Sequence, residues 1–147
     1  MYVGYRYYES AAVPVRYPFG YGLSYTTFEY SDLEATENTV SFTLTNTGNM
    51  SGAEVSQIYL SCKNGRVYRP KKELRHFAKT YLEAGESRRI SITLNPRDFS
   101  YYNVTEGRWD IEDADYDILV GASVSDIRLS ATVHINGSSS APIYPAC

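Results

Sequence analysis

Apolar and polar residues alternate along much of the chain, which is the pattern of a half-buried β-strand. The alternation is clearest at residues 40–45 and 89–94, where every second position is valine, phenylalanine, leucine or isoleucine. Residues 55–60 are apolar at four of six positions, which predicts a central strand. Further strands are predicted at residues 25–35, 101–102, 109–111, 116–120 and 127–135, together with a short aromatic strand in residues 1–10. Residues 74–82 fit a helix and a strand equally well.

Turn-forming residues separate these segments. Asn-Thr-Gly-Asn at 46–49 and Ala-Gly-Glu at 84–86 are typical of turns, and Pro-Arg-Asp-Phe at 96–99 predicts a corner between two sheets. No segment predicts a long helix. Short alternating strands separated by turns indicate an all-β fold, namely an immunoglobulin-like antiparallel β-sandwich, and 147 residues are enough for one such domain.

An aromatic loop precedes the first regular strand. Its large side chains and its proline are Tyr17, Pro18, Phe19, Tyr21, Leu23 and Tyr25. Proline and the two glycines at 20 and 22 favour a shaped, non-repetitive backbone. A loop this apolar either fills the end of its own domain or forms a surface for a neighbour. We expect the six residues to make an interdomain contact, because they are too many to be covered by one small sandwich.

Charge and composition exclude several classes of partner. The net charge is −3, so a phosphate backbone finds no electrostatic support. The only basic cluster, residues 66–72, reads as a solvated loop or, less simply, as a binding patch. Neither a membrane span nor a signal peptide is recognisable, which favours a cytoplasmic protein, although the sequence does not establish its own true N-terminus. We therefore expect no nucleic acid and no membrane partner.

Metal and cofactor sites are not expected. The two cysteines, Cys62 and Cys147, are too few for a zinc site and are predicted to be free thiols. The acidic run 110–117 reads as a calcium loop or as a solvated turn, and the turn is favoured because the glycine of a calcium-binding hand is missing. His76 and His134 each lie on a predicted strand without a nucleophile motif, so a structural role is expected for both.

Two groups of residues could carry chemistry. Asp98, at the predicted corner, is expected to accept hydrogen bonds from backbone donors or to pair with Arg97. Tyr101, Tyr102 and Trp109 could form a platform on which a sugar stacks, but we expect them in the sandwich core and in domain contacts, with Trp109 buried.

Six segments together resemble one known family. Residues 17–28 resemble the PFG-x-GLSYT-x-F signature that opens the fibronectin type III-like domain of family 3 glycoside hydrolases, the β-glucosidase group. Residues 3–8 resemble the tail of the α/β domain that precedes this domain, and residues 70–74, 95–101, 116–123 and 126–129 resemble its later motifs in the same order. The family usually has a Pro-Gly turn before the penultimate strand, where this chain has Asp113-Ala114.

The resemblance implies a domain organisation and a function. Residues 1–16 would be the tail of an α/β domain and a connector, residues 17–136 the sandwich, and residues 137–147 a flexible exit or linker. Because the family's catalytic motifs are absent, no catalytic residue is assigned. The chain is then an accessory, non-catalytic module that stabilises and orients the catalytic barrel and α/β domains of a parent O-glycosyl hydrolase. The alternative is a free-standing carbohydrate-binding or adhesion module.

Overall fold

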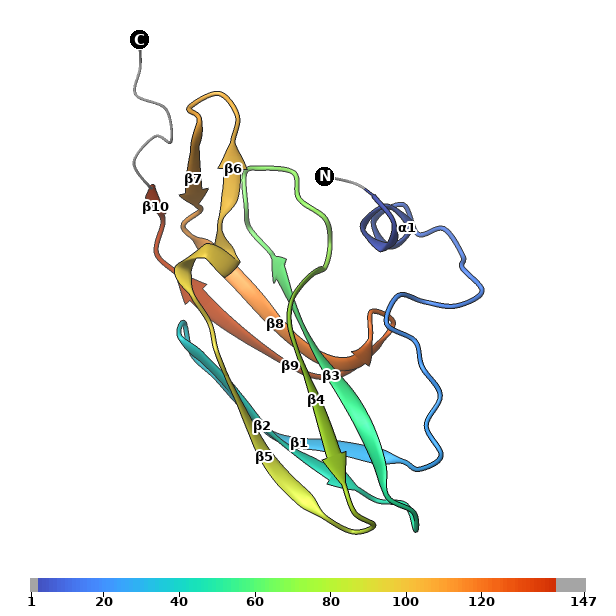
Figure 1. Cartoon of the computed structure of the whole chain (residues 1–147). Coiled ribbons are helices and arrows are strands. Elements are labelled where there is room, and N and C mark those ends of the chain that lie inside the picture. The colour runs from blue at the N-terminus through green and yellow to red at the C-terminus, as the bar shows by residue number, and fades with distance from the viewer. Residues whose placement is uncertain (1–2, 140–147) are drawn as a thin grey trace.

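The computed structural model describes residues 3–139 and shows two antiparallel sheets packed face to face (Figure 1). One sheet has the order β1-β2-β5, with bounds Phe28–Ala35, Thr39–Asn46 and Ser87–Thr93. The other has the order β4-β3-β8-β9, with bounds Glu73–Leu82, Gly52–Cys62, Ala114–Ser123 and Asp126–Ile135. The predicted β-sandwich is confirmed, and β3 lies inside its sheet as expected for a central strand.

The core lies between the two sheets and follows the alternation in the sequence. In β2, every second side chain is fully buried, from Val40 through Phe42 to Leu44. These side chains belong to the same buried cluster as Ile58 of β3 and Ile118 of β8. Burying large apolar side chains in this way contributes roughly 1.5–3 kcal/mol each. The pattern of hydrophobic positions therefore explains both sheets.

A third, small sheet lies beside the sandwich. It consists of β6 (Tyr101–Asn103), β7 (Arg108–Ile111) and β10 (Ser138–Ser139), and the 3₁₀-helix η1 (Pro96–Phe99) leads into it. Trp109 is only half-buried here, so its predicted place in the core is wrong. The reason is topological, because the hairpin of β6 and β7 projects beyond the two main sheets (Figure 1).

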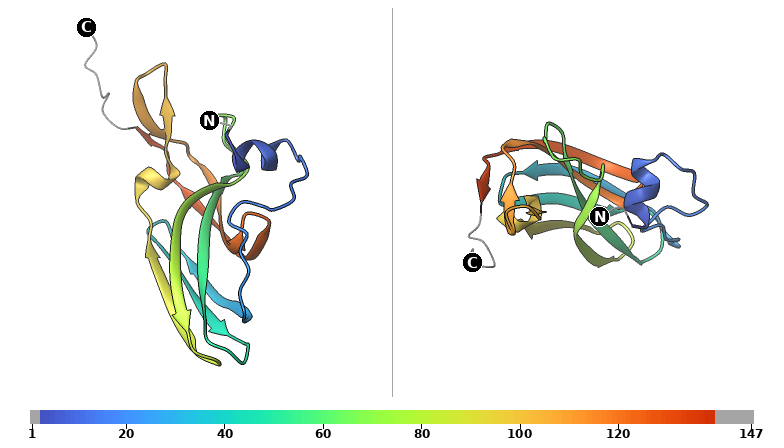
Figure 2. Two further views of the ribbon diagram at one scale, coloured as in Figure 1. Left: turned by 45° about the vertical axis from the view of Figure 1, so that its right-hand side comes forward. Right: turned by 90° about the horizontal axis from the view of Figure 1, so that it is seen from above.

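The N-terminal segment differs from the prediction. Residues 5–10 form a short helix, α1 (Tyr5–Ser10), instead of an aromatic strand. Side chains of α1 that contact the sandwich include Tyr5 and Glu9, four residues apart on one helix face. Figure 2 shows α1 beside one end of β3 and β4. The ambiguous residues 74–82 are a strand, since β4 pairs with β3 over most of its length.

Two further expectations concern the ends of strands. Asp113 and Ala114, which replace the family's usual Pro-Gly turn, lead directly into β8, where Ala114 is buried and pairs with Ile135. Cys62 is a free thiol at the end of β3, whereas Cys147 lies outside the described residues. Within residues 3–139, no helix combines the length and the apolar character needed to cross a membrane.

Candidate interdomain surface

The aromatic loop is fixed to the sandwich through its backbone. Gln57 of β3 donates from Nε2 to the carbonyl oxygens of Gly20, at 3.2 Å, and Ala122, at 3.0 Å. The hydroxyl of Tyr59 donates to Oε1 of the same glutamine, and the amide of Val124 donates to the carbonyl of Phe19 at 3.0 Å. Because the anchors are main-chain carbonyls, the loop is held while its side chains remain available.

Gly20 is required for this attachment. The amide of Tyr21 donates to the carbonyl of Pro18 at 3.0 Å, and Gly20, the third residue of this turn, has φ +79°. A positive φ at the third position is the mark of a type II turn. A Cβ atom on Gly20 would lie 2.2 Å from Oε1 of Gln57. The sequence therefore needs glycine here for both conformation and space.

Five of the six predicted contact residues are exposed. Leu23 and Tyr25 are 90% and 93% exposed, and Tyr17, Phe19 and Tyr21 also lie at the surface, while Pro18 is half-buried. The loop therefore does not fill the interior of the sandwich. We call these six residues, together with the exposed Tyr7 and Tyr8 of α1, the aromatic surface.

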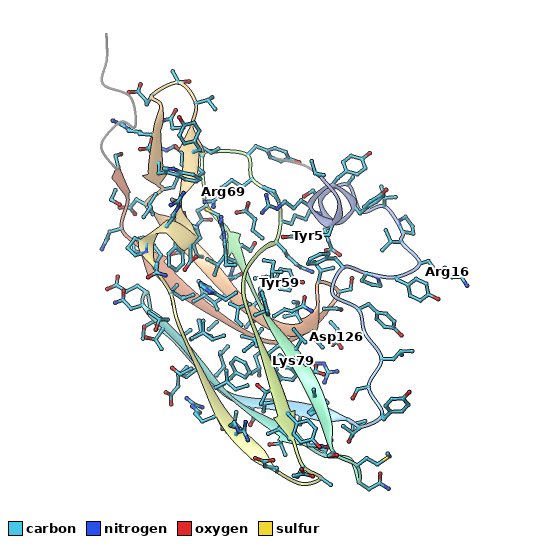
Figure 3. All side chains as sticks on the ribbon, viewed as in Figure 1. Tyr5, Arg16, Tyr59, Arg69, Lys79 and Asp126 are labelled. Carbon is cyan, nitrogen blue, oxygen red and sulfur yellow. The ribbon has the colours of Figure 1, made fainter. Side chains whose placement is uncertain are left out.

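Helix α1 joins this surface through a stack of rings. The ring of Tyr5 stacks on Phe19 with centroids 4.3 Å apart and meets the edge of Tyr59 at 6.3 Å. Figure 3 shows Tyr5 beside Tyr59, and the Tyr5 oxygen also accepts a hydrogen bond from the amide of Leu74 at 2.8 Å. Burial raises the pKa of Tyr59, which keeps its hydroxyl protonated as the donor to Gln57.

An ion pair also holds α1 to the sandwich, one helical turn beyond Tyr5. Glu9 Oε2 lies 3.2 Å from Lys72 Nζ, which also donates to the carbonyl of Val124 at 2.7 Å. Between α1 and the loop runs a groove of about 250 Å³ whose walls include Tyr8 and Tyr17. The helix, the loop and the sandwich thus form one continuous structure, with an aromatic groove open to the outside.

The basic cluster of residues 66–72 is used inside the molecule. Arg69 is buried and bonds through its guanidinium to Glu73, at 3.1 Å, and to the carbonyl of Phe99, at 3.2 Å. Lys72 is occupied by Glu9. Only Arg66 and Lys71 remain exposed, so the cluster does not form the basic patch considered from the sequence.

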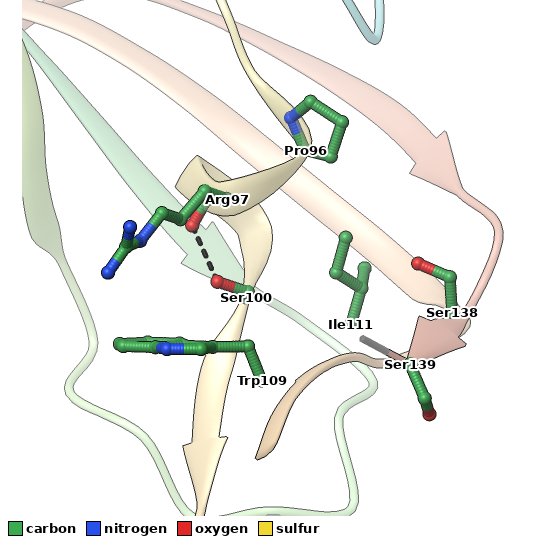
Figure 4. Close-up of a pocket in the computed structure, with 7 residues that line it drawn as sticks. All are labelled: Pro96, Arg97, Ser100, Trp109, Ile111, Ser138 and Ser139. Carbon is green, nitrogen blue, oxygen red and sulfur yellow. Dashed lines mark hydrogen bonds between the residues drawn. The ribbon is translucent and has the colours of Figure 1, made fainter. Parts of the chain in front are cut away.

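The three aromatic residues near the small sheet do not share one platform. Tyr101 lies under the guanidinium of Arg69, with 6.0 Å between Arg69 Cζ and the ring centroid. Tyr102 meets Trp109 edge-on at 5.4 Å, and Arg97 stands over the indole at 4.9 Å. Figure 4 shows Arg97 over the Trp109 indole among the residues that line a pocket of about 300 Å³. A sugar stacking on Trp109 would compete with the guanidinium for that face.

The corner residue Asp98 has the predicted role with a different partner. Its Oδ2 accepts from the amide of Asn95 at 2.8 Å, which confirms the role as acceptor for a backbone donor. The same oxygen lies 2.8 Å from His76 Nε2, and this histidine, not Arg97, is its side-chain partner. Both His76 and Asp98 are therefore structural at the η1 corner.

The acidic run 110–117 contains a pH-sensitive contact rather than a calcium loop. His134 Nδ1 lies 2.9 Å from Asp115 Oδ1, and its Nε2 lies 3.2 Å from Asp113 Oδ1. Among residues 3–139, no three histidine, cysteine or carboxylate side chains are grouped so that they could hold a metal ion. The run thus pairs with a neighbouring strand.

We expect the pKa of His134 to lie above its ordinary value, since the hydrogen bond with Asp115 and the charge of Asp113 both favour the imidazolium. The pair then stabilises the fold below the unfolded-state pKa, and this contribution is lost as the pH rises through the folded-state pKa. An NMR titration of the imidazole protons measures it. Asp115→Asn should lower the pKa of His134, and an unchanged value in that variant would contradict the assignment.

Several residues that shape the surface escaped the sequence prediction. Gln57 and Arg69 each make several part-buried polar contacts, yet neither belongs to a recognisable motif. A glutamine inside an apolar strand was the one available signal, because a buried amide must find hydrogen-bond partners.

Comparison with known proteins agrees with this architecture. The family described as "Fibronectin type III-like domain" matches residues 54–124. The thermostable beta-glucosidase B of Acetivibrio thermocellus is 40% identical over 146 residues, which are 94% of this chain and 19% of that protein. The beta-glucosidase 3B of Thermotoga neapolitana, solved with glucose, superposes with a TM-score of 0.90 at 41% identity and 96% coverage of this chain.

A third relative is named as a member of glycoside hydrolase family 3 (GH3). The GH3 beta-glucosidase of Bifidobacterium adolescentis superposes with a TM-score of 0.88 at 39% identity, covering 92% of this chain and 21% of that protein. The chain therefore spans about a fifth of the length of these relatives. Its fold, its matched residues and these likenesses together assign the chain to the fibronectin type III-like domains of family 3 glycoside hydrolases.

Proposed function

We propose that this sandwich is an accessory, non-catalytic module of a β-glucosidase-like enzyme, and that it stabilises and orients the catalytic domains. The observation that carries the proposal is the aromatic surface, where large side chains are exposed on a backbone fixed by Gln57 and Tyr5. Exposed apolar clusters of this kind usually mark an interface. A fixed loop also loses little conformational entropy when it docks.

The chemistry of the described residues supports a non-catalytic role. A glycosidase needs two carboxyl groups facing one sugar, with one of them tuned as an acid. Here three of the half-buried or buried carboxylates are paired instead, Glu9 with Lys72, Glu73 with Arg69 and Asp98 with His76. At the platform considered for the free-standing carbohydrate-binding alternative, Arg97 stands over one face of the Trp109 indole, where a sugar would stack.

A chimera tests the proposal. This chain would replace the matched segment of the Bifidobacterium adolescentis GH3 beta-glucosidase, and loss of aryl β-glucosidase activity would be followed at raised temperature. We expect the chimera to outlast an enzyme that lacks the segment, and the isolated chain to show no hydrolysis. Tyr17→Ser with Tyr21→Ser should speed inactivation roughly tenfold, since two docked rings are removed.

The matched control is Val104→Ser, which removes an exposed apolar side chain in the turn between β6 and β7, outside the aromatic surface. This control should inactivate at the rate of the unmodified chimera. Equal inactivation rates for the chimera and for the enzyme without the segment would refute the stabilising role. Hydrolysis by the purified chain that one acid-to-amide substitution abolishes would refute the non-catalytic one.

A further inference from the structure

The outer face of β3 and β4 is apolar where a solvent-facing sheet is usually polar. In the antiparallel register, Ala53 pairs with Tyr81, Val55 with Lys79 and Gln57 with Phe77. Phe77 and Tyr81 are 69% and 54% exposed, and Val55 is exposed as well. An antiparallel sheet that faces water on one side normally alternates apolar-in with polar-out. We call Ala53, Val55, Phe77, Lys79 and Tyr81 the β3–β4 strip.

The core does not account for this strip. The inward neighbours in the same strands, Ser56, Ile58, Thr80 and Leu82, are the ones buried against the other sheet. Both faces of β3 and β4 therefore carry apolar residues, but the opposite sheet covers only the inner face. Strands with two apolar faces are typical of sheets covered on both sides.

The chain itself covers the neighbouring part of the same face. Tyr5 lies on Tyr59, and the loop carbonyl of Gly20 is bonded to Gln57, so α1 and the aromatic loop lie over one end of β3. Leu23 then extends the loop toward Ala53 and Val55, with which it lines a hollow of about 180 Å³. The strip is thus continuous with the aromatic surface and is its uncovered extension.

The charge on the strip restricts what can cover it. Lys79 is its single charged residue, and no carboxylate belongs to it. Interface centres are depleted of charged residues and enriched in aromatic ones, which is the composition found here. A lysine among apolar side chains, once desolvated, requires an acidic partner.

We propose that the β3–β4 strip is a second contact area for the same neighbouring domain that docks on the aromatic surface, and this inference rests on the proposed function. The partner surface is apolar and places a carboxylate opposite Lys79. The two areas together make one extended interface, which fixes the sandwich against rotation as well as against dissociation. Its occupant is thereby a domain of the same polypeptide and not a second copy of this chain.

Hydroxyl-radical footprinting tests the strip without any substitution. Side-chain modification rates would be measured by mass spectrometry in the isolated chain and in the chimera with the Bifidobacterium adolescentis enzyme. We expect the rates at Phe77 and Tyr81 to fall at least fivefold in the chimera. Val104, exposed in the turn between β6 and β7, should be modified at equal rates in both and serves as the internal control.

The outcomes separate this inference from the proposed function. Unchanged rates at Phe77 and Tyr81, combined with protection of Tyr17 and Tyr21, would overturn the inference and leave the proposed function intact. If none of these four side chains is protected in the chimera, both the inference and the proposed function are overturned. If the isolated chain sediments as a dimer that Phe77→Ser with Tyr81→Ser turns into a monomer, the strip binds a second copy and the inference fails.

A variant in the chimera supplies an independent measure. Phe77→Ser with Tyr81→Ser should leave the melting temperature of the isolated chain within a few degrees, because both rings are exposed. In the chimera the same two substitutions should speed thermal inactivation several-fold relative to the Val104→Ser control. Equal rates for the two chimeras would contradict a docked strip.

Discussion

Arg69→Met is expected to lower the free energy of unfolding by about 3 kcal/mol, because it removes a partner of the buried Glu73 carboxylate and the donor to three further buried or half-buried groups. The Arg69 side chain is only 7% exposed and joins the loop after β3 to Glu73, to the carbonyls of Phe99 and Ser100 and to the hydroxyl of Tyr116. Methionine replaces the volume without the donors. Urea denaturation followed by tyrosine fluorescence measures the change.

Two control variants test whether the loss of stability in Arg69→Met comes from the lost guanidinium contacts. Arg66→Met, in the same loop but exposed, should change stability by less than about 0.5 kcal/mol. Arg69→Lys keeps the charge but loses the forked geometry, so it should lie between the two. Arg75 and Arg6 also lie near Glu73, at 2.9 Å and 3.8 Å. A stable Arg69→Met protein would show that these two arginines suffice to neutralise the carboxylate.

Gly20→Ala is expected to destabilise the domain by about 2 kcal/mol and to release the aromatic loop. Alanine in the left-handed conformation costs about 1–2 kcal/mol, and its Cβ would displace Gln57, on which Tyr59 also depends. Thermal unfolding measures the loss of stability. Amide hydrogen exchange at Phe19 and Val124 reports whether the loop has detached.

The loop contains its own control. Gly22 lies two residues further on, has no positive φ, and has open space where a Cβ would be placed. Gly22→Ala should therefore leave both the melting temperature and the exchange rate at Val124 nearly unchanged. If both glycines tolerate alanine equally, the attachment through Gln57 does not hold the loop.

The sandwich could be predicted because its determinants are local. A strand buried on one face repeats every two residues, and β2 shows that repeat without interruption. Helix α1 could not be predicted in the same way. It is too short to be stable from its own propensity and is formed by contacts of Tyr5 and Glu9 with distant strands.

The aromatic surface was predictable in part. The composition of residues 17–25 indicated exposed rings, but it could not show how the loop is held, since Gln57 and Tyr59 lie more than thirty positions away. The β3–β4 strip was hidden for a different reason. Phe77 and Tyr81 read as ordinary strand residues until the register shows on which face they lie. Trp109 was misplaced because a tryptophan was assumed to be core, whereas its hairpin projects from the sandwich.

The contacts that hold α1 to the sandwich restrict the motion of a domain joined to this helix. Residues 11–18 lead away from α1, and the chain returns to the same helix at Phe19, whose ring rests on Tyr5, so this stretch closes a loop and does not act as a hinge. A domain attached directly before α1 would turn with the sandwich as one rigid body. Its docking surfaces would meet at a high effective concentration, and modest contacts would suffice to keep them closed. Cutting the chain within residues 11–18 should therefore leave the two parts associated.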